Sequence, residues 1–400
     1  MTHVLLVVEN LPLARDHRLR KQVAALAGAG CRVSVICRAD PQNATVPDVA
    51  VREYRAPIDG HSPLGFLREY GYSLLAARRL IRRTHARDPF AAIQISGTPD
   101  LYFAIAAPLR RAGVRLVFDQ RDLSPELYEL RYGRRDAAYR TLLRLERASY
   151  RAADHVITVN RSLERVAYER GGVAPGGVTI VGNGPSRDAG RDAVPRPVLK
   201  HGRRLLCCWI GVMGPQDRVD VALRAVAVLV HERGRTDTHF AFVGDGESRG
   251  AAQQLATDLG LGDYTSFPGW LPEHDVHAYL ATADVGLEPN LEEIVSPVKV
   301  MEYMAFGVPF AAFDLAETRL LSGDAGVYAP PGDTRTLAAH LDDLLDDDAR
   351  RAALGRCGRQ RVLDELCWER QAARYVDVYR ELLSASPSPL SRPSEQMGVL

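Results

Sequence analysis

The stretch Val4–Val8, with the sequence VLLVV, decides the fold class of this chain. Every residue in it is apolar, which is typical of a strand that lies in a parallel sheet and is covered on both faces. Helical periodicity follows over residues 14–29 and ends at Gly30, and a second apolar strand is predicted at Arg32–Cys37. Strand, helix and strand in this order predict a parallel α/β sheet with right-handed crossovers.

The same alternation runs through the first half of the chain and restarts after a polar interruption. Residues 183–203 are rich in Gly, Pro, Arg and Asp, which indicates a linker. Before it, strands are predicted at 91–95, 115–119, 155–159 and 178–181, and helices at 64–83, 101–112, 135–152 and 162–170. After it, strands are predicted at 205–210, 238–243, 264–267, 285–288 and 310–313, and helices at 218–232, 251–259, 274–281, 299–302, 334–346, 349–363 and 368–384.

A chain of 400 residues is too long for one ordinary hydrophobic core, so two domains are expected. The predicted organisation is a Rossmann-like domain at 1–182, the linker at 183–203, a second Rossmann-like domain at 204–365, a helix at 366–384 and a disordered Ser/Pro-rich tail at 385–400. Ligands of doubly wound sheets bind at the carboxyl ends of the strands. We therefore expect the two domains to face each other across a cleft that holds the site.

The composition excludes several classes of function. The chain is 46% hydrophobic and 25% charged, with a net charge of +1, which is ordinary for a soluble protein and favours no nucleic-acid partner. No apolar run approaches the roughly 20 residues of a membrane span. The N-terminus lacks the pattern of a signal peptide, and the six cysteines lack metal-ligand spacing. These features favour a cytoplasmic protein with reduced thiols.

The segment 296–309 predicts a short helix with a ligand at its start. Ser296 is a suitable N-cap, Pro297 suits the first helical position, and the helix is expected to end at Gly307. Lys299 lies in the first turn, where the helix dipole favours anions, and Glu302 follows three residues later. This placement suggests an anionic ligand such as a diphosphate at the helix start. The alternative is a solvated helix whose lysine has no special role.

Three further loops follow predicted strands in the second half. A glycine turn at 211–218 ends in Arg218, which suits a phosphate, although a solvated arginine is an equal alternative. The sequence Gly-Asp-Gly at 244–246 is also a common turn. The loop 267–272 contains Trp270, which could stack on a planar base or pack in the core. Together these loops indicate a ligand site more strongly than any one of them.

In the first half, charged residues gather after the strand predicted at 115–119. The segment 118–126 carries Arg121 and Asp122, and we expect it to face the cleft; the alternative is an Asp/Arg ion pair with Ser124 capping the next turn. The loop 9–12, which leads to residues 15–18, is the other loop expected at the cleft. It could hold an acceptor substrate.

Several other patterns look functional. The aspartates at 346–348 and the histidines His274 and His277 lack the partners of a metal site, so metal binding is not expected there. Arg78, Arg79, Arg82 and Arg83 lie on a predicted helix with apolar residues. Such a helix favours either peripheral contact with an anionic membrane, at its inner face, or a solvated basic surface.

These segments resemble the retaining glycosyltransferases of family GT4, which have the GT-B fold, and the resemblance covers nearly the whole chain. Its most specific parts are 211–220, 243–247, 267–272, 283–289 and 299–309, with 16–19, 119–126 and 181–184 in the first half. The last predicted helix is similar to the GT-B segment that crosses back onto the first domain.

The resemblance implies that the second half binds a nucleotide sugar, expected to be a UDP-sugar. It implies donor contacts from Gly211, Val212, Met213, Gly214, Gly244, Gly246, Gly269, Trp270, Leu271, Ser296, Lys299 and Glu302, with Glu302 on the ribose. Three positions depart from the family pattern. The first glutamate of a Glu-x7-Glu motif falls on Ile294, Asp217 stands at a phosphate-binding lysine, and Arg121 replaces a histidine that contacts the donor sugar.

The implied reaction transfers a sugar with retained configuration to a hydroxyl of a saccharide, lipid-linked saccharide or natural product. Catalytic contacts are implied for Arg121, Asp122, Arg218 and Lys299, and acceptor contacts for Asn10, Arg15, Asp16, Arg18, Glu126 and Asn183. Stabilisation of charge on the leaving diphosphate would drive the reaction, with no metal and no cofactor expected. The alternatives are a GT-B sugar-nucleotide epimerase or hydrolase, and an inactive nucleotide-binding partner.

Overall fold

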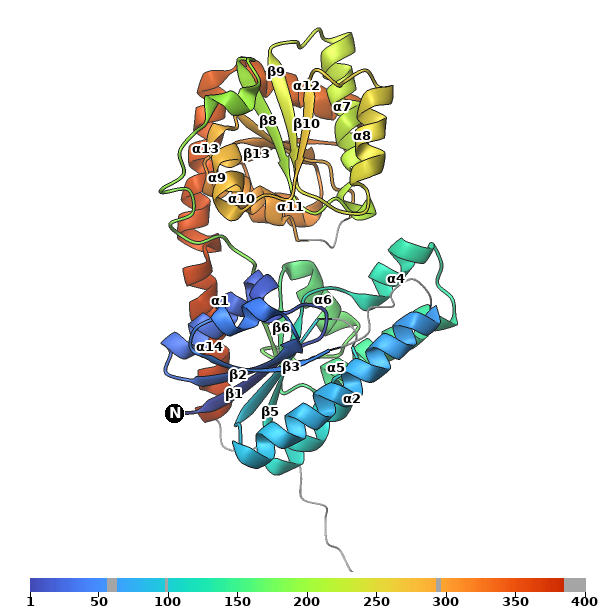
Figure 1. Ribbon diagram of the computed structural model, residues 1–400, viewed down its shortest axis with the longest axis vertical. Helices are drawn as coiled ribbons and strands as arrows, with labels where there is room; N and C mark the ends of the chain where they lie inside the picture. The colour runs from blue at the N-terminus through green and yellow to red at the C-terminus, as the bar shows by residue number, and fades with distance from the viewer. Residues whose placement is uncertain (56–62, 98–99, 293–295, 385–400) are drawn as a thin grey trace, which may run out of the picture. The chain divides into compact units, whose positions relative to one another are not determined.

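The computed structural model describes residues 1–55, 63–97, 100–292 and 296–384, in two compact units (Figure 1). The first unit comprises Met1–Gly182 together with the chain from Gln371 on, and the second comprises Asn183–Arg370. Residues 183–203, expected as a separate linker, belong to the second unit and include the 3-10 helix η4 (Pro197–Lys200). The tail at 385–400 lies outside the described residues.

The first unit is built on a seven-stranded parallel sheet in the order β3-β2-β1-β4-β5-β6-β7. Strand β1 lies between β2 and β4, with Val4 opposite Val33 on one side and Ala92 on the other. The strand order therefore reverses at β1/β4, which is the doubly wound pattern expected from the sequence. The strands are β1 (His3–Val8), β2 (Arg32–Arg38), β3 (Val49–Tyr54), β4 (Ala92–Ser96), β5 (Arg115–Gln120), β6 (His155–Thr158) and β7 (Val178–Ile180).

Capping side chains mark where several helices of this unit begin. Asp16 accepts a hydrogen bond from the amide of Leu19 at the start of α1, and Asn160 does so from Leu163 at the start of α6. The helix expected at 101–112 is a short α-helix at Phe103–Ala106 followed by a 3-10 helix at Ala107–Ala112. Pro108 lies in the first turn of the 3-10 helix. The helical elements are η1 (Leu13–Arg15), α1 (His17–Gly28), η2 (Pro41–Thr45), α2 (Pro63–Arg87), α3 (Phe103–Ala106), η3 (Ala107–Ala112), α4 (Ser124–Tyr132), α5 (Ala137–Ala152), α6 (Arg161–Glu169) and, mainly in this unit, α14 (Trp368–Ser384).

The second unit has a six-stranded parallel sheet in the order β10-β9-β8-β11-β12-β13. Its strands are β8 (Leu205–Ile210), β9 (Thr238–Val243), β10 (Thr265–Gly269), β11 (Val285–Glu288), β12 (Phe310–Phe313) and β13 (Gly326–Ala329). Its remaining helical elements are η5 (Pro215–Asp217), α7 (Val219–Ala227), η6 (Val228–Glu232), α8 (Arg249–Asp258), α9 (Glu273–Thr282), α10 (Val298–Ala305), α11 (Ala316–Ser322), α12 (Thr334–Asp346), α13 (Asp348–Arg361) and η7 (Val362–Leu366).

The strands that the sequence did not predict, β3 and β13, are both edge strands. An edge strand is covered less completely, so its apolar pattern is weaker; residues 49–53 of β3 are partly or fully exposed. Within the central strand β8 every residue is buried, and alternate side chains enter two clusters. Trp209 belongs to the cluster with Phe240, and Cys208 to the cluster with Tyr303.

A buried polar network fastens α14 to the first sheet. Tyr375 and Tyr379 both donate hydrogen bonds to the side-chain oxygen of Gln94 on β4, at 2.8 and 2.6 Å. Asp119 on β5 is fully buried and accepts from the guanidinium of Arg18 at 2.8 Å and from Gln22 at 3.0 Å. Although burial opposes ionisation, the charges of Arg18 and Arg121 hold the pKa of Asp119 below its usual range.

We expect Asp119→Asn to lower the free energy of unfolding by about 3 kcal/mol or more, because it leaves buried guanidinium groups without their counter-ion. The control is Asp314→Asn, which breaks an exposed ion pair with Arg319 (2.9 Å) and is expected to cost less than about 1 kcal/mol. Urea unfolding followed by circular dichroism compares the two. Equal losses in both variants would contradict a special role for the buried network.

Candidate functional site

Three loops at the carboxyl ends of β8, β9 and β10 are joined to one another through their backbones. The amide of Gly211 donates to the carbonyl of Val243 (3.0 Å), and the amide of Gly244 donates to the carbonyl of Gly269 (3.1 Å). Met213 likewise donates to the carbonyl oxygen of residue 245 (2.9 Å). The ligand loops predicted from the sequence therefore form one continuous surface at the edge of the second sheet.

The glycines in these loops permit close backbone contact. Gly244 has φ +142°, and a Cβ atom on it would lie 1.8 Å from the carbonyl oxygen of Gly211. Gly246 has φ +157°, and a Cβ there would lie 2.6 Å from the carbonyl oxygen of Met213. The amides of Gly211 and Gly244 are not open to a phosphate oxygen in this arrangement. They are already donated to protein carbonyls, so the glycines serve loop packing.

Helix α10 begins one residue later than expected. Pro297 occupies the N-cap position with φ −78° and ψ 70°, so Val298 is the first helical residue. Ser296 provides no side-chain cap; its carbonyl accepts from the amide of Val298 at 2.8 Å. The predicted N-cap at Ser296 is wrong because the backbone at Pro297 turns before the helix starts. Lys299 still lies in the first turn, and Glu302 lies partly buried one turn further.

Lys299 is surrounded by groups from three other segments. Its Nζ lies 2.6 Å from Oδ1 of Asp217, 3.9 Å from Oε2 of Glu288 and 5.1 Å from the ring centroid of Trp209. Burial lowers the pKa of Lys299, but Glu288 and Asp217 outweigh burial and raise it. Burial raises the pKa of Glu288. Sequence reasoning missed this charge cluster, since its members are far apart in the chain.

Other predicted donor residues lie in different surroundings. Arg218 has the left-handed φ of +49° and pairs with Asp220, at 3.0 Å. Trp270 is 71% exposed, which excludes the alternative of a packed core position. Val212 is also exposed, whereas Met213 is buried in the cluster that contains Trp209. Leu271 is partly buried and packs against the other cluster, which contains Tyr303. The exposed indole is free of core packing and so suited to a planar ligand.

In the first unit, Arg121 follows β5 and is held by two carboxylates. Its Nη1 donates to Asp16, and its Nε donates to Asp119 at 3.2 Å. Its Nη2 is buried and has no hydrogen-bond partner among the residues that the structure describes. The N–H groups of this nitrogen therefore lack an acceptor within the described part of the chain.

The structure places several predicted acceptor residues in protein contacts. Arg18 is 8% exposed and donates to Asp119 and to the carbonyl of Val181, so it is part of the core, and its acceptor contact stays a prediction. Asp16 caps α1 and holds Arg121. Of the other four, Asn10 is exposed, Arg15 is bound to Asp40 at 2.9 Å, Glu126 is bound by Arg170, and Asn183 is partly buried at the start of the second unit.

A cluster of carboxyl groups lies beside this site. Burial raises the pKa of Asp100 to about 7, with Glu146 adding to the rise and Ser124 opposing it. Asp122, the neighbour of Arg121, is exposed and lies near enough to Asp100 for their charges to interact. Glu146 is held by Arg170, whose Nε lies 2.7 Å from Oε1. Asp100 was not predicted as a site residue, because nothing near it in sequence shows its burial.

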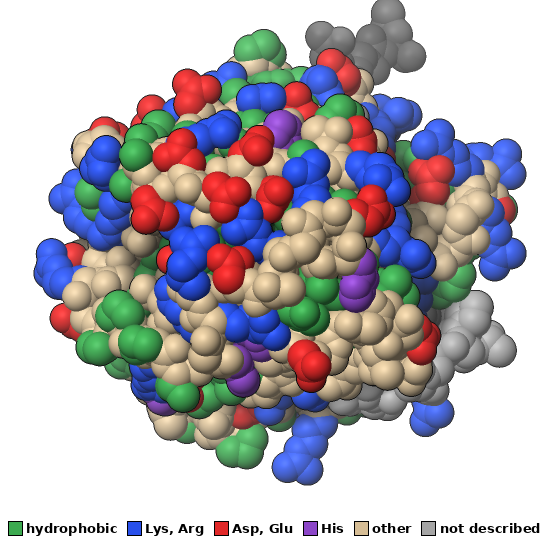
Figure 2. Space-filling model, turned by 90° about the horizontal axis from the view of Figure 1, so that it is seen from above, with side chains coloured by type: hydrophobic (Ala, Val, Ile, Leu, Met, Phe, Trp, Pro, Cys, Tyr) green, Lys and Arg blue, Asp and Glu red, His purple; other side chains and the backbone are tan. Residues whose placement is uncertain are grey.

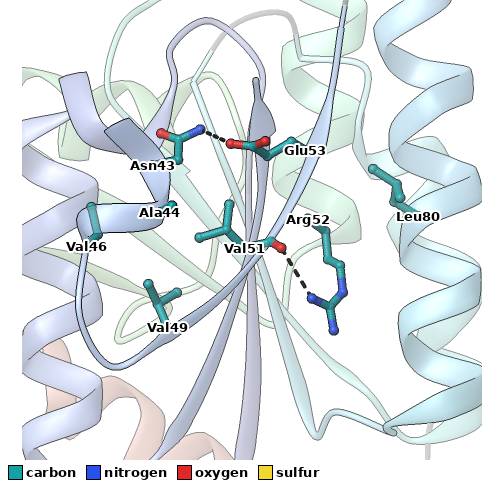
Figure 3. A pocket seen from close by; sticks show the side chains of 8 residues that line it. All are labelled: Asn43, Ala44, Val46, Val49, Val51, Arg52, Glu53 and Leu80. Carbon is teal, nitrogen blue, oxygen red and sulfur yellow. Dashed lines mark hydrogen bonds between the residues drawn. The ribbon is translucent and has the colours of Figure 1, made fainter. Parts of the chain in front are cut away.

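A separate cavity of about 560 Å³ lies at the edge strand β3 (Figure 3). Its polar side chains already have partners: the amide of Asn43 donates to Glu53 at 2.6 Å, and Arg52 donates to the carbonyl of Val51. None of the predicted site residues lines it. Its lining consists of Asn43, Ala44, Val46, Val49, Val51, Arg52, Glu53 and Leu80.

Within the described ranges, no group of three or more His, Cys, Asp or Glu side chains is arranged to hold a metal ion. Nor is any described helix long and apolar enough to cross a membrane. Acidic and basic side chains are interspersed on the face shown in Figure 2. The residues 293–295, which include the position of the absent motif glutamate at Ile294, lie outside the described residues.

Comparison with family models gives two matches that together cover most of the chain. Residues 16–184 match the description "Glycosyl transferase 4-like domain", and residues 204–347 match "Glycosyl transferases group 1".

Curated relatives match over shorter lengths. The chain is 30% identical over 247 residues to the D-inositol 3-phosphate glycosyltransferase of Thermobispora bispora, which is 58% of this chain and 56% of the relative. It is 29% identical over 185 residues to a GDP-mannose-dependent phosphatidylinositol monomannoside mannosyltransferase of Mycolicibacterium smegmatis, 44% of this chain and 48% of the relative. The chain thus spans about half the length of the curated relatives it matches.

Solved structures are similar over nearly the whole chain. Sucrose-phosphate synthase from Thermosynechococcus elongatus has a TM-score of 0.79 at 20% identity, covering 96% of this chain and all of that one. HepE of Anabaena, solved with UDP and glucose, has a TM-score of 0.74 at 18% identity, with coverage of 96% and 100%. At these identities the likeness establishes the fold.

We expect the stability of the first unit to depend on the protonation of Asp100. Because its pKa is raised to about 7 in the folded state, the stability it contributes is full below its unfolded pKa near 4 and is lost as pH rises through 7. Between pH 5 and 8 the wild type should lose about 2 kcal/mol that Asp100→Asn keeps. Urea unfolding at both pH values measures the difference.

The control for this prediction is Asp314→Asn. A hydrogen bond from Arg319 lowers the pKa of Asp314, so this carboxylate stays ionised throughout the range. A parallel pH dependence in wild type and Asp100→Asn would show that Asp100 does not titrate there.

Proposed function

Since the chain belongs to the GT4-like, group 1 glycosyltransferases of GT-B fold, we propose that it transfers a sugar from a nucleotide sugar to an acceptor hydroxyl. The observation that carries the proposal is the meeting of Lys299 with the glycine loops at the carboxyl ends of β8, β9 and β10. This edge is where doubly wound sheets bind ligands. Arg121 and Asp122 follow β5, at the carboxyl edge of the first sheet.

Each part of the donor has a suited group in this site. Lys299 and the remaining loop amides suit the diphosphate, because an ammonium and backbone N–H groups bind phosphate oxygens. The carboxylate of Glu302 suits the two ribose hydroxyls, and the exposed Trp270 suits the base. A UDP-sugar is the favoured donor. HepE, which shares the fold, is solved with UDP and glucose, whereas the relative from Mycolicibacterium smegmatis is named as GDP-mannose-dependent.

The proposed reaction retains the configuration at the sugar carbon and uses no metal ion. The leaving diphosphate develops charge as its bond to the sugar breaks, and Lys299 and Arg218 would stabilise that charge. Both are fixed before substrate binds, so little reorganisation is needed in the transition state. In the first unit, the free Nη2 of Arg121 would bind an oxygen of the donor or the acceptor. The acceptor is a saccharide, a lipid-linked saccharide or a natural product.

Peripheral membrane contact is part of the proposal. Tyr72 and Leu75 on α2 are 49% and 67% exposed, and the arginines at 78, 79, 82 and 83 are exposed on the same helix. An exposed apolar pair flanked by arginines suits an anionic membrane surface. A lipid-linked acceptor would then be reached from this surface.

The donor site is tested by calorimetry with UDP, GDP, TDP and ADP. We expect one nucleotide to bind selectively, and Lys299→Ala to weaken it by roughly ten- to hundredfold, since a charge-assisted hydrogen bond is lost. Glu302→Ala should weaken it by about tenfold through the ribose contacts.

The matched control is Lys200→Ala. Lys200 also pairs with an aspartate, Asp284, at 2.8 Å. Asp284 directly precedes β11, so this pair lies at the amino end of the strand and not at the carboxyl end. Loss of Lys200 should leave binding unchanged. If no nucleotide binds, or if both lysine variants behave alike, the donor site is assigned wrongly and the chain has another role on the same fold.

Membrane contact is tested by sedimentation with phosphatidylglycerol vesicles, using phosphatidylcholine vesicles as the uncharged reference. Arg79→Gln with Arg83→Gln should reduce binding to the anionic vesicles about thirtyfold, since each arginine near such a surface contributes about 1 kcal/mol. Leu75→Gln should also reduce it, while Leu320→Gln, an exposed leucine (43%) of the second unit, should not. Absence of binding by the wild type would reject the contact.

A further inference from the structure

The carboxylate of Asp217 occupies two anion-binding groups of the second unit at once. Its Oδ1 accepts from the ammonium of Lys299 at 2.6 Å, and its Oδ2 accepts from the backbone amide of Gly214 at 3.2 Å. The side chains of both ion-pair partners are largely buried, with 14% of Asp217 and 16% of Lys299 exposed. The contact is therefore a shielded one and not a loose surface ion pair.

An ammonium and a glycine-turn amide are the kinds of donor that bind a phosphate oxygen in proteins. In this chain the carboxylate of Asp217 accepts hydrogen bonds from both of these donors. The neighbouring loop repeats the arrangement, because the amide of Gly246 donates to Oδ1 of Asp245 at 2.8 Å. Two carboxylates thus cap amides that the glycine loops would otherwise offer to an anion.

Lys299 is held in place by contacts that do not involve Asp217. Its ammonium lies 5.1 Å from the ring centroid of Trp209 and 3.9 Å from Glu288. Its Cε lies so close to Gly211 that a Cβ on that residue would be 2.7 Å away. Removing the charge of Asp217 would therefore leave the ammonium where it is, with one strong acceptor fewer.

We propose that Asp217 determines how tightly the site around Lys299 holds a nucleoside diphosphate. Its carboxylate takes the place of a phosphate oxygen and has to be displaced before the diphosphate binds. The proposal rests on the donor site proposed above. Asp217 ends the three-residue turn η5, so a small change in this turn would move the carboxylate away. Even then a like charge stays near the diphosphate, which weakens binding and eases release of the product nucleotide.

The test measures binding of UDP and GDP to the full chain by calorimetry. Asp217→Asn is expected to lower the dissociation constant about tenfold, because it removes a like charge beside the diphosphate and frees Lys299. Asp217→Ala should act in the same direction. Uridine, which has no phosphate, should bind no differently to wild type and variants. In the double variant Asp217→Asn with Lys299→Ala the gain should disappear.

The matched control is Asp284→Asn. Asp284 accepts from a lysine ammonium and a backbone amide just as Asp217 does, from Lys200 and Leu206, both at 2.8 Å. Its loss changes the net charge equally, yet it should leave the dissociation constant within about twofold. Thermal melting of each variant confirms that it is folded.

The outcomes separate this proposal from the function on which it rests. If wild type binds a nucleotide and folded Asp217→Asn binds it equally or more weakly, the role of Asp217 is overturned and the donor site stands. An equal gain in Asp284→Asn would overturn it as well, since the effect would then be one of net charge. If neither wild type nor the Asp217 variants bind UDP or GDP, the proposal and the donor site both fall.

Discussion

The close contact between Gly244 and the carbonyl of Gly211 is the constraint on which the loops at the carboxyl ends of β8, β9 and β10 depend. We propose that these loops bind the donor. Parallel strands end at one edge of a sheet, so the loops that follow β8, β9 and β10 have to share that edge. They do so by direct backbone contact, with hydrogen bonds between 2.9 and 3.1 Å linking them. A Cβ atom at Gly244 has no room, and without this packing Lys299 would lose the glycine surface against which its side chain lies.

In both units the cation that we propose to bind substrate is paired with carboxylates of the same unit. Lys299 is bound by Asp217, and Arg121 is bound by Asp16 and Asp119. Such pairing fixes the position of each cation before a ligand arrives, which is the condition for electrostatic preorganisation. It also opposes ligand binding, because an incoming anion competes with a carboxylate already present. The balance between preorganisation and this competition would set how tightly each cation binds an anionic ligand.

The fold was largely predictable from local patterns, whereas the roles of the site residues stay predictions. Strands at 238–243, 285–288 and 310–313 have the predicted bounds, since buried strands have continuous apolar runs. The loops after the strands predicted at 205–210, 238–243 and 264–267 were also identified, because glycine turns after strands are local signals. The role of Arg18 was not: an arginine that begins a helix beside a charged loop looks solvated until Asp119, about a hundred residues later, is placed against it.

By itself the sequence determined the two parallel α/β units, the order of their elements and the loops that carry glycine, lysine and glutamate at strand ends. These follow from periodicity and turn chemistry within a few residues. Only the tertiary structure decided that Asp217 binds Lys299, that Arg18 is a core residue, that Trp270 is exposed and that Asp100 is buried. The physical reason is that burial, ion pairing and the pKa of a side chain depend on neighbours brought together from distant parts of the chain.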